Sequence, residues 1–314
     1  MNHAEPQASA IKVVYIAGYG RSGTTLLSIA LGQHPRIFGA GEIHELTRHA
    51  WEQNTFCSCA RALRDCPFWS DVVGRWLGSD EINLIDDYRR AQGRFESLGA
   101  PYLARIGIGG GSHFSRFAEQ TGRLFHLIAS ASGKQVIVDS SKLPGRAWAL
   151  AQTGLFEVYV VHMVRDGRGV AWSMMKGYKR DARAGLQREI KPKSALRTGL
   201  RWTMVNLAAE DLRRMVGADR YMRVRYEDFA TDPAQVIARI GDRIGVDLSA
   251  VGKGVAAGEA MAPHHQIAGN RLRMNPTVKV AIDESWRSQM PESSRRRFGR
   301  LCGWLLRRYD YDHA

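Results

Sequence analysis

Short apolar runs alternate with longer amphipathic stretches along most of this chain. Four of these runs have the length and pattern of strands: 11–17, 135–139, 156–164 and 220–226. Apolar residues recur with the helical period in 24–33, 113–132, 167–177, 194–217, 232–245 and 291–309. Strands that alternate with helices predict the α/β class, with three α/β/α layers around a mostly parallel central sheet.

Two parts of the chain lack this regular alternation. Between 55 and 110 the periodicity weakens and glycines multiply, which predicts a helical insertion beside the core of a single domain spanning 1–314. Residues 250–285 have the pattern of loops, and residues 41–53 that of a helix after a short strand. In a parallel sheet, ligands bind at the carboxyl ends of the strands, so binding residues are expected just after each predicted strand.

The segment after the first predicted strand, GYGRSGTT at 18–25, has the spacing of a phosphate-binding loop. Its glycines allow several backbone N–H groups to converge on one anion, and the following helix adds the positive end of its dipole. Nucleoside triphosphatases place Lys and then Ser or Thr where this chain has Thr24 and Thr25, and here the charge comes from Arg21. This phosphate loop predicts a P-loop-like fold that handles an anion with less charge than a phosphoryl group, such as a sulfuryl group.

The overall charge agrees with an anionic ligand. The 314 residues include 45 Lys and Arg against 31 Asp and Glu, a net charge of +14, which favours nucleotides, nucleic acid, anionic lipid or a polyanionic substrate. No run reaches the roughly 18 apolar residues of a membrane span, and the polar N-terminus does not resemble a secretory signal. Four cysteines are too few for a disulfide framework, which predicts a reducing, cytoplasmic setting.

A second anion-binding pattern follows the third predicted strand, in VRDGRGVAWS at 164–173. Arg165 ends the strand and Ser173 lies two turns into the next helix, so both are expected to face the same crevice. A rigid guanidinium group and a hydroxyl group together make a good phosphate clamp. The alternative is that Arg165 forms an ion pair with Asp166 or with another carboxylate.

These two motifs, together with FCSCARALRDCPFW, RVRYEDFATDP, HHQIAGNRLR and ESWR, resemble the sulfotransferases that use 3′-phosphoadenosine 5′-phosphosulfate, in their bacterial and tyrosylprotein-like branch. The resemblance implies transfer of a sulfuryl group from this cofactor to a hydroxyl acceptor, with no metal required. It implies contacts to the 5′-phosphosulfate by Arg21, Ser22, Gly23, Thr24 and Thr25. It implies contacts to the rest of the cofactor by Arg165, Ser173, Tyr226, Asn270 and Arg273.

Sulfuryl transfer to a hydroxyl group needs a general base, and cations that hold the moving oxygens. Arg21 and Lys142 are the predicted cations, because Lys142 in DSSKLP follows the second predicted strand. Cytosolic sulfotransferases have a histidine base before this Leu-Pro pair, and the chain departs from that pattern. Resemblance to the tyrosylprotein type implies Glu42 as the base. Capping of the next helix is the alternative role for Glu42, and His44 and Glu45 are the alternative bases.

Cys57, Cys59 and Cys66 form a cluster in the sequence, with spacing C-x-C and then six residues before the last cysteine. Three thiolates with His44 or His49 as a fourth ligand would suit zinc. The usual C-x-x-C pair is absent, so the pattern favours a structural thiol cluster, with or without a disulfide, over a metal site.

Two other functions are compatible with parts of the sequence. A P-loop kinase-like phosphotransferase would need ATP and magnesium, and Thr24 stands where its lysine belongs. A basic nucleic-acid-binding protein fits the charge, but no recognition motif of that class is present and the basic residues are scattered. For a sulfotransferase, the acceptor remains open between a carbohydrate, a lipid, a peptide and a small metabolite. Its pocket is expected to be shaped by 55–110 and 177–195.

Overall fold

The computed structural model of the chain describes residues 10–79, 81–105, 111–177, 179, 181, 189 and 191–311. The glycine-rich break expected near 106–110 and most of the segment 177–195 lie outside the described residues. The predicted contribution of 177–195 to an acceptor pocket is therefore still a prediction.

A sheet of five parallel strands forms the centre of the molecule, in the order β2-β3-β1-β4-β5. The strands are β1 (Lys12–Ala17), β2 (Ile37–Gly41), β3 (Val136–Lys142), β4 (Glu157–Val164) and β5 (Tyr221–Arg225). All four predicted strands are present, and β2 is the short strand expected before Glu42. The predicted α/β class and parallel sheet are therefore confirmed.

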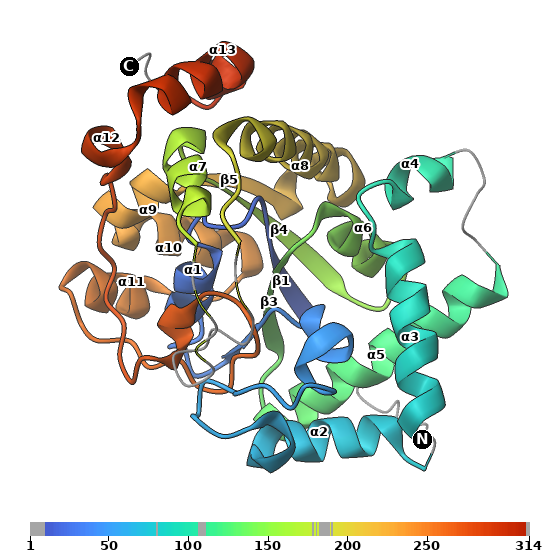
Figure 1. The fold of residues 1–314 in the computed structure, drawn as a ribbon. Coiled ribbons are helices and arrows are strands. Elements are labelled where there is room, and N and C mark those ends of the chain that lie inside the picture. Colours follow the sequence, from blue (N-terminus) through green and yellow to red (C-terminus); the bar gives the residue numbers. More distant parts are fainter. Residues whose placement is uncertain are drawn as a thin grey trace.

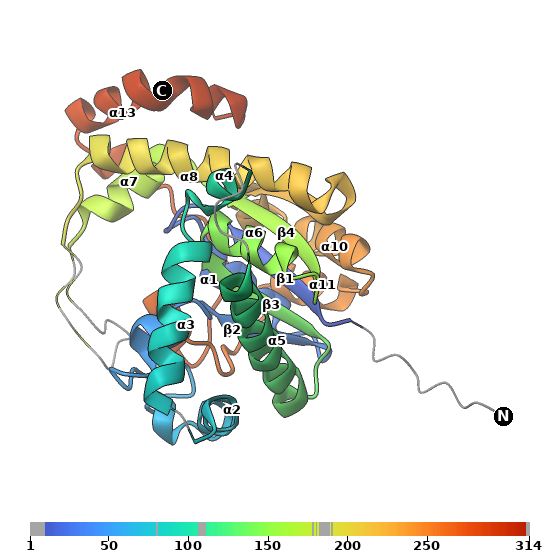
Figure 2. The ribbon, with the colours of Figure 1, turned by 90° about the vertical axis from the view of Figure 1, so that its right-hand side faces the viewer.

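Helices cover both faces of this sheet (Figure 1; Figure 2). One face carries α1 (Thr24–Leu31), α10 (Pro233–Ile244) and α11 (Ser249–Ala256), and the other carries α5 (Ser112–Ser132), α6 (Pro144–Gln152) and α8 (Ala195–Val216). Along β1, Val13 and Tyr15 belong to one apolar cluster while Val14 and Ile16 belong to the other. Because both faces of β1 are buried, its sequence is continuously apolar rather than alternating.

The predicted insertion contains three helices, which are α2 (Pro67–Leu77), α3 (Glu81–Phe95) and α4 (Ala100–Arg105). Helices α2 and α3 pack on α5, outside the sheet (Figure 2). Trp69 and Trp76 are fully buried in the same apolar cluster as α5 and α6. The insertion thus shares the main core, although the division of the chain into domains is not tested by this packing.

Three local predictions differ from the structure. Residues 41–53 hold only a π-helical turn (Leu46–Ala50), and the supposed loop 250–285 overlaps α11. Helix α6 was not expected, because all of its residues from Pro144 to Leu150 are buried and an all-round buried helix has no amphipathic period. The short α11 contains two glycines, which weaken a helical pattern.

Further helices pack beside the main sheet: α7 (Gly167–Met175), α9 (Tyr226–Thr231), α12 (Trp286–Gln289) and α13 (Glu292–Arg308). Helix α13 lies along α8 (Figure 1; Figure 2). Within the described ranges, none of the helices combines the length and apolar character that crossing a membrane requires.

Candidate active site

The phosphate loop (residues 18–25) connects the carboxyl end of β1 to the start of α1. Gly18 and Gly23 have φ values of +135° and +87°, and a Cβ atom on them would lie 2.2 Å from Met163 O and 2.6 Å from the Tyr226 ring. Only glycine suits these two positions. Ser22 is fully buried, and its Oγ has no hydrogen-bond partner among the described residues. The loop therefore combines a tight backbone cradle with a buried, unsatisfied hydroxyl group.

Two predicted catalytic cations occupy unusual backbone conformations. Arg21 and Lys142 have φ values of 72° and 73°, in the left-handed region that residues other than glycine seldom adopt. Such a conformation costs on the order of 1–3 kcal/mol of conformational free energy, and residues that adopt it cluster at functional sites. The N–H of Gly18 donates to Lys142 O at 3.1 Å, so the end of β3 is fixed to the phosphate loop.

Lys142 Nζ forms an ion pair with the carboxylate of Glu42, and both side chains are largely buried. Glu42 follows β2, and its N–H donates to Ile267 O at 2.8 Å. Gly269, two residues after Ile267, lies beside both Glu42 and Thr25. A Cβ atom on Gly269 would stand 3.1 Å from Glu42 Oε1 and 3.1 Å from Thr25 Oγ1. The ends of β1, β2 and β3 thus bring Glu42, Lys142 and the phosphate loop together.

His44 faces a different set of residues. Its Nδ1 lies 2.6 Å from Glu96 Oε2, and Glu96 pairs in turn with Arg146, whose Nε donates to Asp139 Oδ2 at 2.8 Å. Burial raises the pKa of Glu96, but Arg146 and the hydrogen bond from His44 outweigh it, so that pKa is lower than usual. All four side chains are buried. Neither Glu96 nor Arg146 is among the residues predicted from the sequence, although an arginine inside the apolar stretch PGRAWALA is a signal of a buried ion pair.

Glu45, the other alternative base, lies beside His49 rather than Glu96. Its carboxylate is 4.0 Å from His49 Nε2, on the π-helical turn that follows. Of the three candidate bases, Glu42 is the one that forms an ion pair with Lys142.

Arg165 lies against the phosphate loop, with its Nη1 donating to Arg21 O at 3.2 Å. Its guanidinium group stacks 4.5 Å from the centre of the Tyr226 ring. Asp283 accepts from Arg165 Nη2 at 3.0 Å, whereas Asp166 pairs with Arg168. Arg165 therefore does have a carboxylate partner, but the partner is Asp283 rather than the neighbouring Asp166.

The remaining predicted cofactor residues differ in their burial and in their hydrogen-bond partners. Thr24 and Thr25 are buried in the first turn of α1, and the N–H of Asn270 donates to Thr25 Oγ1 at 3.2 Å. Tyr226 is buried, and its hydroxyl group donates to Ala281 O at 2.8 Å, so its ring supports Gly23 and Arg165. Ser173 is half-buried on α7.

Arg273 lies inside the protein. Its side chain is 1 % exposed, and its Nη1 donates to Phe56 O at 2.8 Å. Its contact with the cofactor, which the family resemblance implies, stays a prediction. In the described structure Arg273 joins two loops inside the protein, because its guanidinium group satisfies carbonyl groups there.

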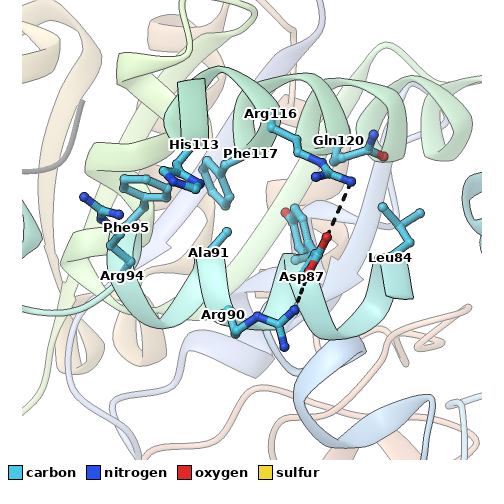
Figure 3. Close-up of a pocket in the computed structure, with 11 residues that line it drawn as sticks. Leu84, Asp87, Arg90, Ala91, Arg94, Phe95, His113, Arg116, Phe117 and Gln120 are labelled. Atoms are coloured by element: carbon cyan, nitrogen blue, oxygen red, sulfur yellow. Dashed lines mark hydrogen bonds and ion pairs between the residues drawn. The ribbon is translucent and has the colours of Figure 1, made fainter. Parts of the chain in front are cut away.

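A cavity of about 310 Å³ lies between α3 and α5 (Figure 3). Tyr88, Phe95 and Phe117 line it, with Arg90 and Arg116 at Asp87. None of the predicted catalytic or cofactor residues lines this cavity.

The fold and this site define a P-loop-like α/β protein with a tight glycine-bounded loop after β1 and a carboxylate–lysine pair beside it. The chain belongs to the sulfotransferase family, whose model matches residues 14–250. A comparison with curated protein sequences found no match.

Solved structures with a similar fold are also sulfotransferases. The sulfotransferase domain of the Synechococcus PCC 7002 olefin synthase has a TM-score of 0.51 and 19% identity, covering 100% of both chains. The domain from the curacin biosynthetic pathway has a TM-score of 0.54 and 18% identity, covering 97% of this chain and 99% of that one. The sulfotransferase STF9 from Mycobacterium avium has a TM-score of 0.50 and 14% identity, covering 97% of this chain and 78% of that one. At these identities the likeness concerns the fold, and it confirms the predicted P-loop-like architecture.

Proposed function

We propose that this protein transfers a sulfuryl group from 3′-phosphoadenosine 5′-phosphosulfate to a hydroxyl group of an acceptor. The observation that carries the proposal is the meeting of Glu42, Lys142 and the phosphate loop at the carboxyl ends of β1, β2 and β3. A proton acceptor, a cation and an anion cradle are the groups that this reaction needs.

The residues present fit the cofactor. The buried hydroxyl group of Ser22 lacks a partner among the described residues, and the glycines of the phosphate loop leave no room for side chains. Arg165 touches the backbone of the same loop and is therefore close enough to bind a second phosphate of the same molecule. Ser173 and Asn270 are assigned to the cofactor with it.

Each side chain has a separate task in the proposed reaction. The cofactor supplies the sulfuryl group and leaves as adenosine 3′,5′-bisphosphate. Glu42 accepts the proton of the acceptor's hydroxyl group. The oxygen of that hydroxyl group attacks sulfur in line with the leaving oxygen. Lys142 and Arg21 neutralise the charge that develops on the transferred group and on the leaving oxygen. Since Lys142 pairs with Glu42 before the reaction, binding of the anion must draw the ammonium group away and release the base.

The buried network of His44, Glu96, Arg146 and Asp139 holds these groups in place. Ser141 receives the N–H of His44 and donates its own N–H to Asp139 Oδ1, each at 3.0 Å. The backbone after β2 and the end of β3 are thereby fixed to each other, next to Glu42 and Lys142. Such support outside the reacting groups keeps a site in its working geometry.

The acceptor is defined here only as a molecule with a hydroxyl group, within the range of carbohydrates, lipids, peptides and small metabolites. We assign binding of the acceptor to the insertion, because Glu96, immediately after α3, belongs to the buried network beside Glu42. The cavity between α3 and α5 is lined by Phe95, the residue before Glu96. Acceptors with an aromatic or apolar part suit that lining.

The proposal is tested first by binding. Adenosine 3′,5′-bisphosphate should raise the melting temperature more than adenosine 5′-phosphate, ATP with magnesium, or duplex DNA. Stabilisation by ATP with magnesium alone would support the kinase, and stabilisation by DNA alone the nucleic-acid-binding protein. Mass spectrometry of products from a panel of hydroxyl acceptors, with the sulfate donor present, then identifies the acceptor class.

A further inference from the structure

Three cysteines and one histidine meet at the side of the molecule where the insertion begins. Sγ of Cys57, Cys59 and Cys66 and a ring nitrogen of His265 all lie within 4.8 Å of one another. Nδ1 of His265 is 3.4 Å from Cys66 Sγ and 3.8 Å from Cys57 Sγ. All of these cysteines are free thiols, and Cys57 and Cys66 are fully buried.

The backbone around the cysteines holds the thiols on one side. In a tight turn, the N–H of Cys57 donates to Arg61 O at 2.8 Å, and Phe56 forms an antiparallel bridge with Ala62. Ala60 closes the turn with a φ of 63°. Cys66 then precedes the first turn of α2, where the positive end of the helix dipole favours a thiolate. We call residues 56–62 the cysteine turn.

His265 comes from a segment about two hundred residues away and is held firmly against this turn. Its ring stacks on Phe68, with ring centres 5.3 Å apart, and Trp69 Nε1 donates to His265 O at 2.7 Å. On either side, Ser58 Oγ donates to His264 O at 2.8 Å and accepts from Gln266 N at 2.7 Å. These contacts leave the Nδ1 edge of the imidazole directed at the thiols.

We propose that Cys57, Cys59, Cys66 and His265 form a structural zinc site. With Zn–S bonds of about 2.3 Å and Zn–N bonds of about 2.0–2.1 Å, the donor atoms of a tetrahedral site lie about 3.5–3.8 Å apart. The two Sγ–Nδ1 separations in the structure, 3.4 Å and 3.8 Å, are close to this range. Four protein ligands leave no open position, so the ion stabilises the fold and takes no part in catalysis.

The surroundings also suit the charge of such a site. Three thiolates on Zn²⁺ leave a net negative charge, which is costly to bury without a counter-charge. The buried guanidinium group of Arg273 donates to Phe56 O, in the cysteine turn. Arg273 thus places a positive charge beside the cysteine turn, where it would offset the negative charge of the site.

The sequence pattern disfavoured zinc because the usual C-x-x-C pair is absent, and it offered only His44 or His49 as a fourth ligand. His44 is bonded to Glu96, and His49 lies beside Glu45, so neither of the two expected histidines is the fourth ligand. The fourth ligand is His265, which only the tertiary fold brings to the cysteines.

The proposed ion would fix the loop that packs on the active site. Two residues after His265, Ile267 pairs with the backbone of Ala40 and Glu42, and the N–H of Asn270 donates to Thr25 Oγ1. Zinc would therefore hold the segment 264–273 against Glu42 and the phosphate loop. This consequence rests on the proposed function, whereas binding of the metal does not.

The test begins with the metal content of the full chain. Protein produced in zinc-supplemented medium and purified without a chelator or a polyhistidine tag should contain one zinc ion per chain, by elemental analysis and native mass spectrometry. After exchange, Co²⁺ should give the thiolate charge-transfer and tetrahedral ligand-field absorption bands of a sulfur-rich site. The variants Cys66→Ser and His265→Ala should lose the ion, whereas Cys302→Ser, a buried thiol near Thr203, should keep it.

Two results would overturn the zinc site. One is wild-type protein that carries no zinc after supplementation and gives no cobalt–thiolate bands. The other is a native mass lower by two hydrogen atoms, which shows a disulfide in place of the metal. If the variants fail to fold, the wild-type metal content and cobalt spectrum still decide the matter. Zinc found in a protein that does not bind adenosine 3′,5′-bisphosphate would contradict the proposed function alone.

Discussion

The ammonium group of Lys142 forms an ion pair with the carboxylate of Glu42, although the two residues are 100 positions apart in the chain. The pair lies where β2 and β3 end, next to the phosphate loop. A base that is paired with a cation at rest and released when an anion binds would link proton removal to the presence of the sulfuryl donor.

The first prediction concerns the base. Glu42→Gln keeps the size of the side chain and removes its charge, so turnover should fall by about a hundredfold or more. The affinity for adenosine 3′,5′-bisphosphate, measured by calorimetry, should change little. Glu45→Gln is the matched variant and should keep normal turnover. If Glu42→Gln stays active while His44→Ala does not, then His44 is the base and the assignment to Glu42 fails.

The second prediction concerns recognition of the 3′-phosphate. The wild-type protein should bind adenosine 3′,5′-bisphosphate more tightly than adenosine 5′-phosphate. Arg165→Ala should remove that preference, because a charge-assisted contact contributes about 1.5–3 kcal/mol, or roughly 10- to 150-fold in affinity. Arg296→Ala, on the exposed face of α13, is the control. Equal affinities of the wild-type protein for the two nucleotides would contradict the role of Arg165.

A third prediction follows from the contact between Arg165 and Asp283. If Arg165 binds the 3′-phosphate as proposed, the carboxylate of Asp283 competes with that phosphate for the same guanidinium group. Asp283→Asn retains the oxygen that accepts the N–H of Ser285 but removes the charge. Because Asp283 is half exposed, the gain in affinity for adenosine 3′,5′-bisphosphate should be modest, about two- to fivefold by calorimetry. Weaker binding would mean that Asp283 orients Arg165 rather than competing for it.

The fourth prediction is that transfer does not need magnesium. The sulfuryl group carries a single negative charge, and Arg21 and Lys142 supply cations beside the phosphate loop. Activity in a short assay should be the same with magnesium and with excess chelator. Loss of activity that magnesium restores would favour the kinase alternative. Slow loss that zinc restores and magnesium does not would instead reflect the proposed structural site.

A fifth prediction concerns stability and His162, which is fully buried in β4. Asn206 Nδ2 donates to Trp202 O, so its Oδ1 accepts from His162 Nε2 at 2.9 Å, and Nδ1 accepts from Tyr221. Burial lowers the pKa of His162 from 6.5 to about 4, so its neutral form is favoured in the folded protein.

Below the unfolded pKa, the unfolded chain therefore binds a proton that the folded protein excludes. Stability contributed by neutral His162 is present above pH 6.5 and is lost as the pH falls toward 4. Between pH 8 and pH 5 the loss should be on the order of 2 kcal/mol, measured by urea unfolding. His162→Gln should show a smaller loss over the same range. An equal loss in both proteins would mean that other groups cause the acid sensitivity.

Local sequence was enough for the parts of the fold that depend on one segment at a time. The apolar runs located four strands, and the glycine spacing of 18–25 located the phosphate loop, because each pattern reflects the conformation of its own residues. Helix α6 was missed because burial on all sides removes the amphipathic period from its sequence. Glu96 and Arg146 were missed because a buried ion pair has no spacing of its own in the sequence.

The sequence by itself determined the family resemblance, the parallel sheet and the position of the phosphate loop, since these follow from contiguous motifs and their order. Only the tertiary structure decided which distant side chains meet. It paired Lys142 with Glu42 and Arg165 with Asp283, turned Arg273 inward, and placed His265 on the cysteine cluster. The physical reason is that contacts across hundreds of residues depend on the order of the strands and the packing of loops on them, which no local pattern specifies.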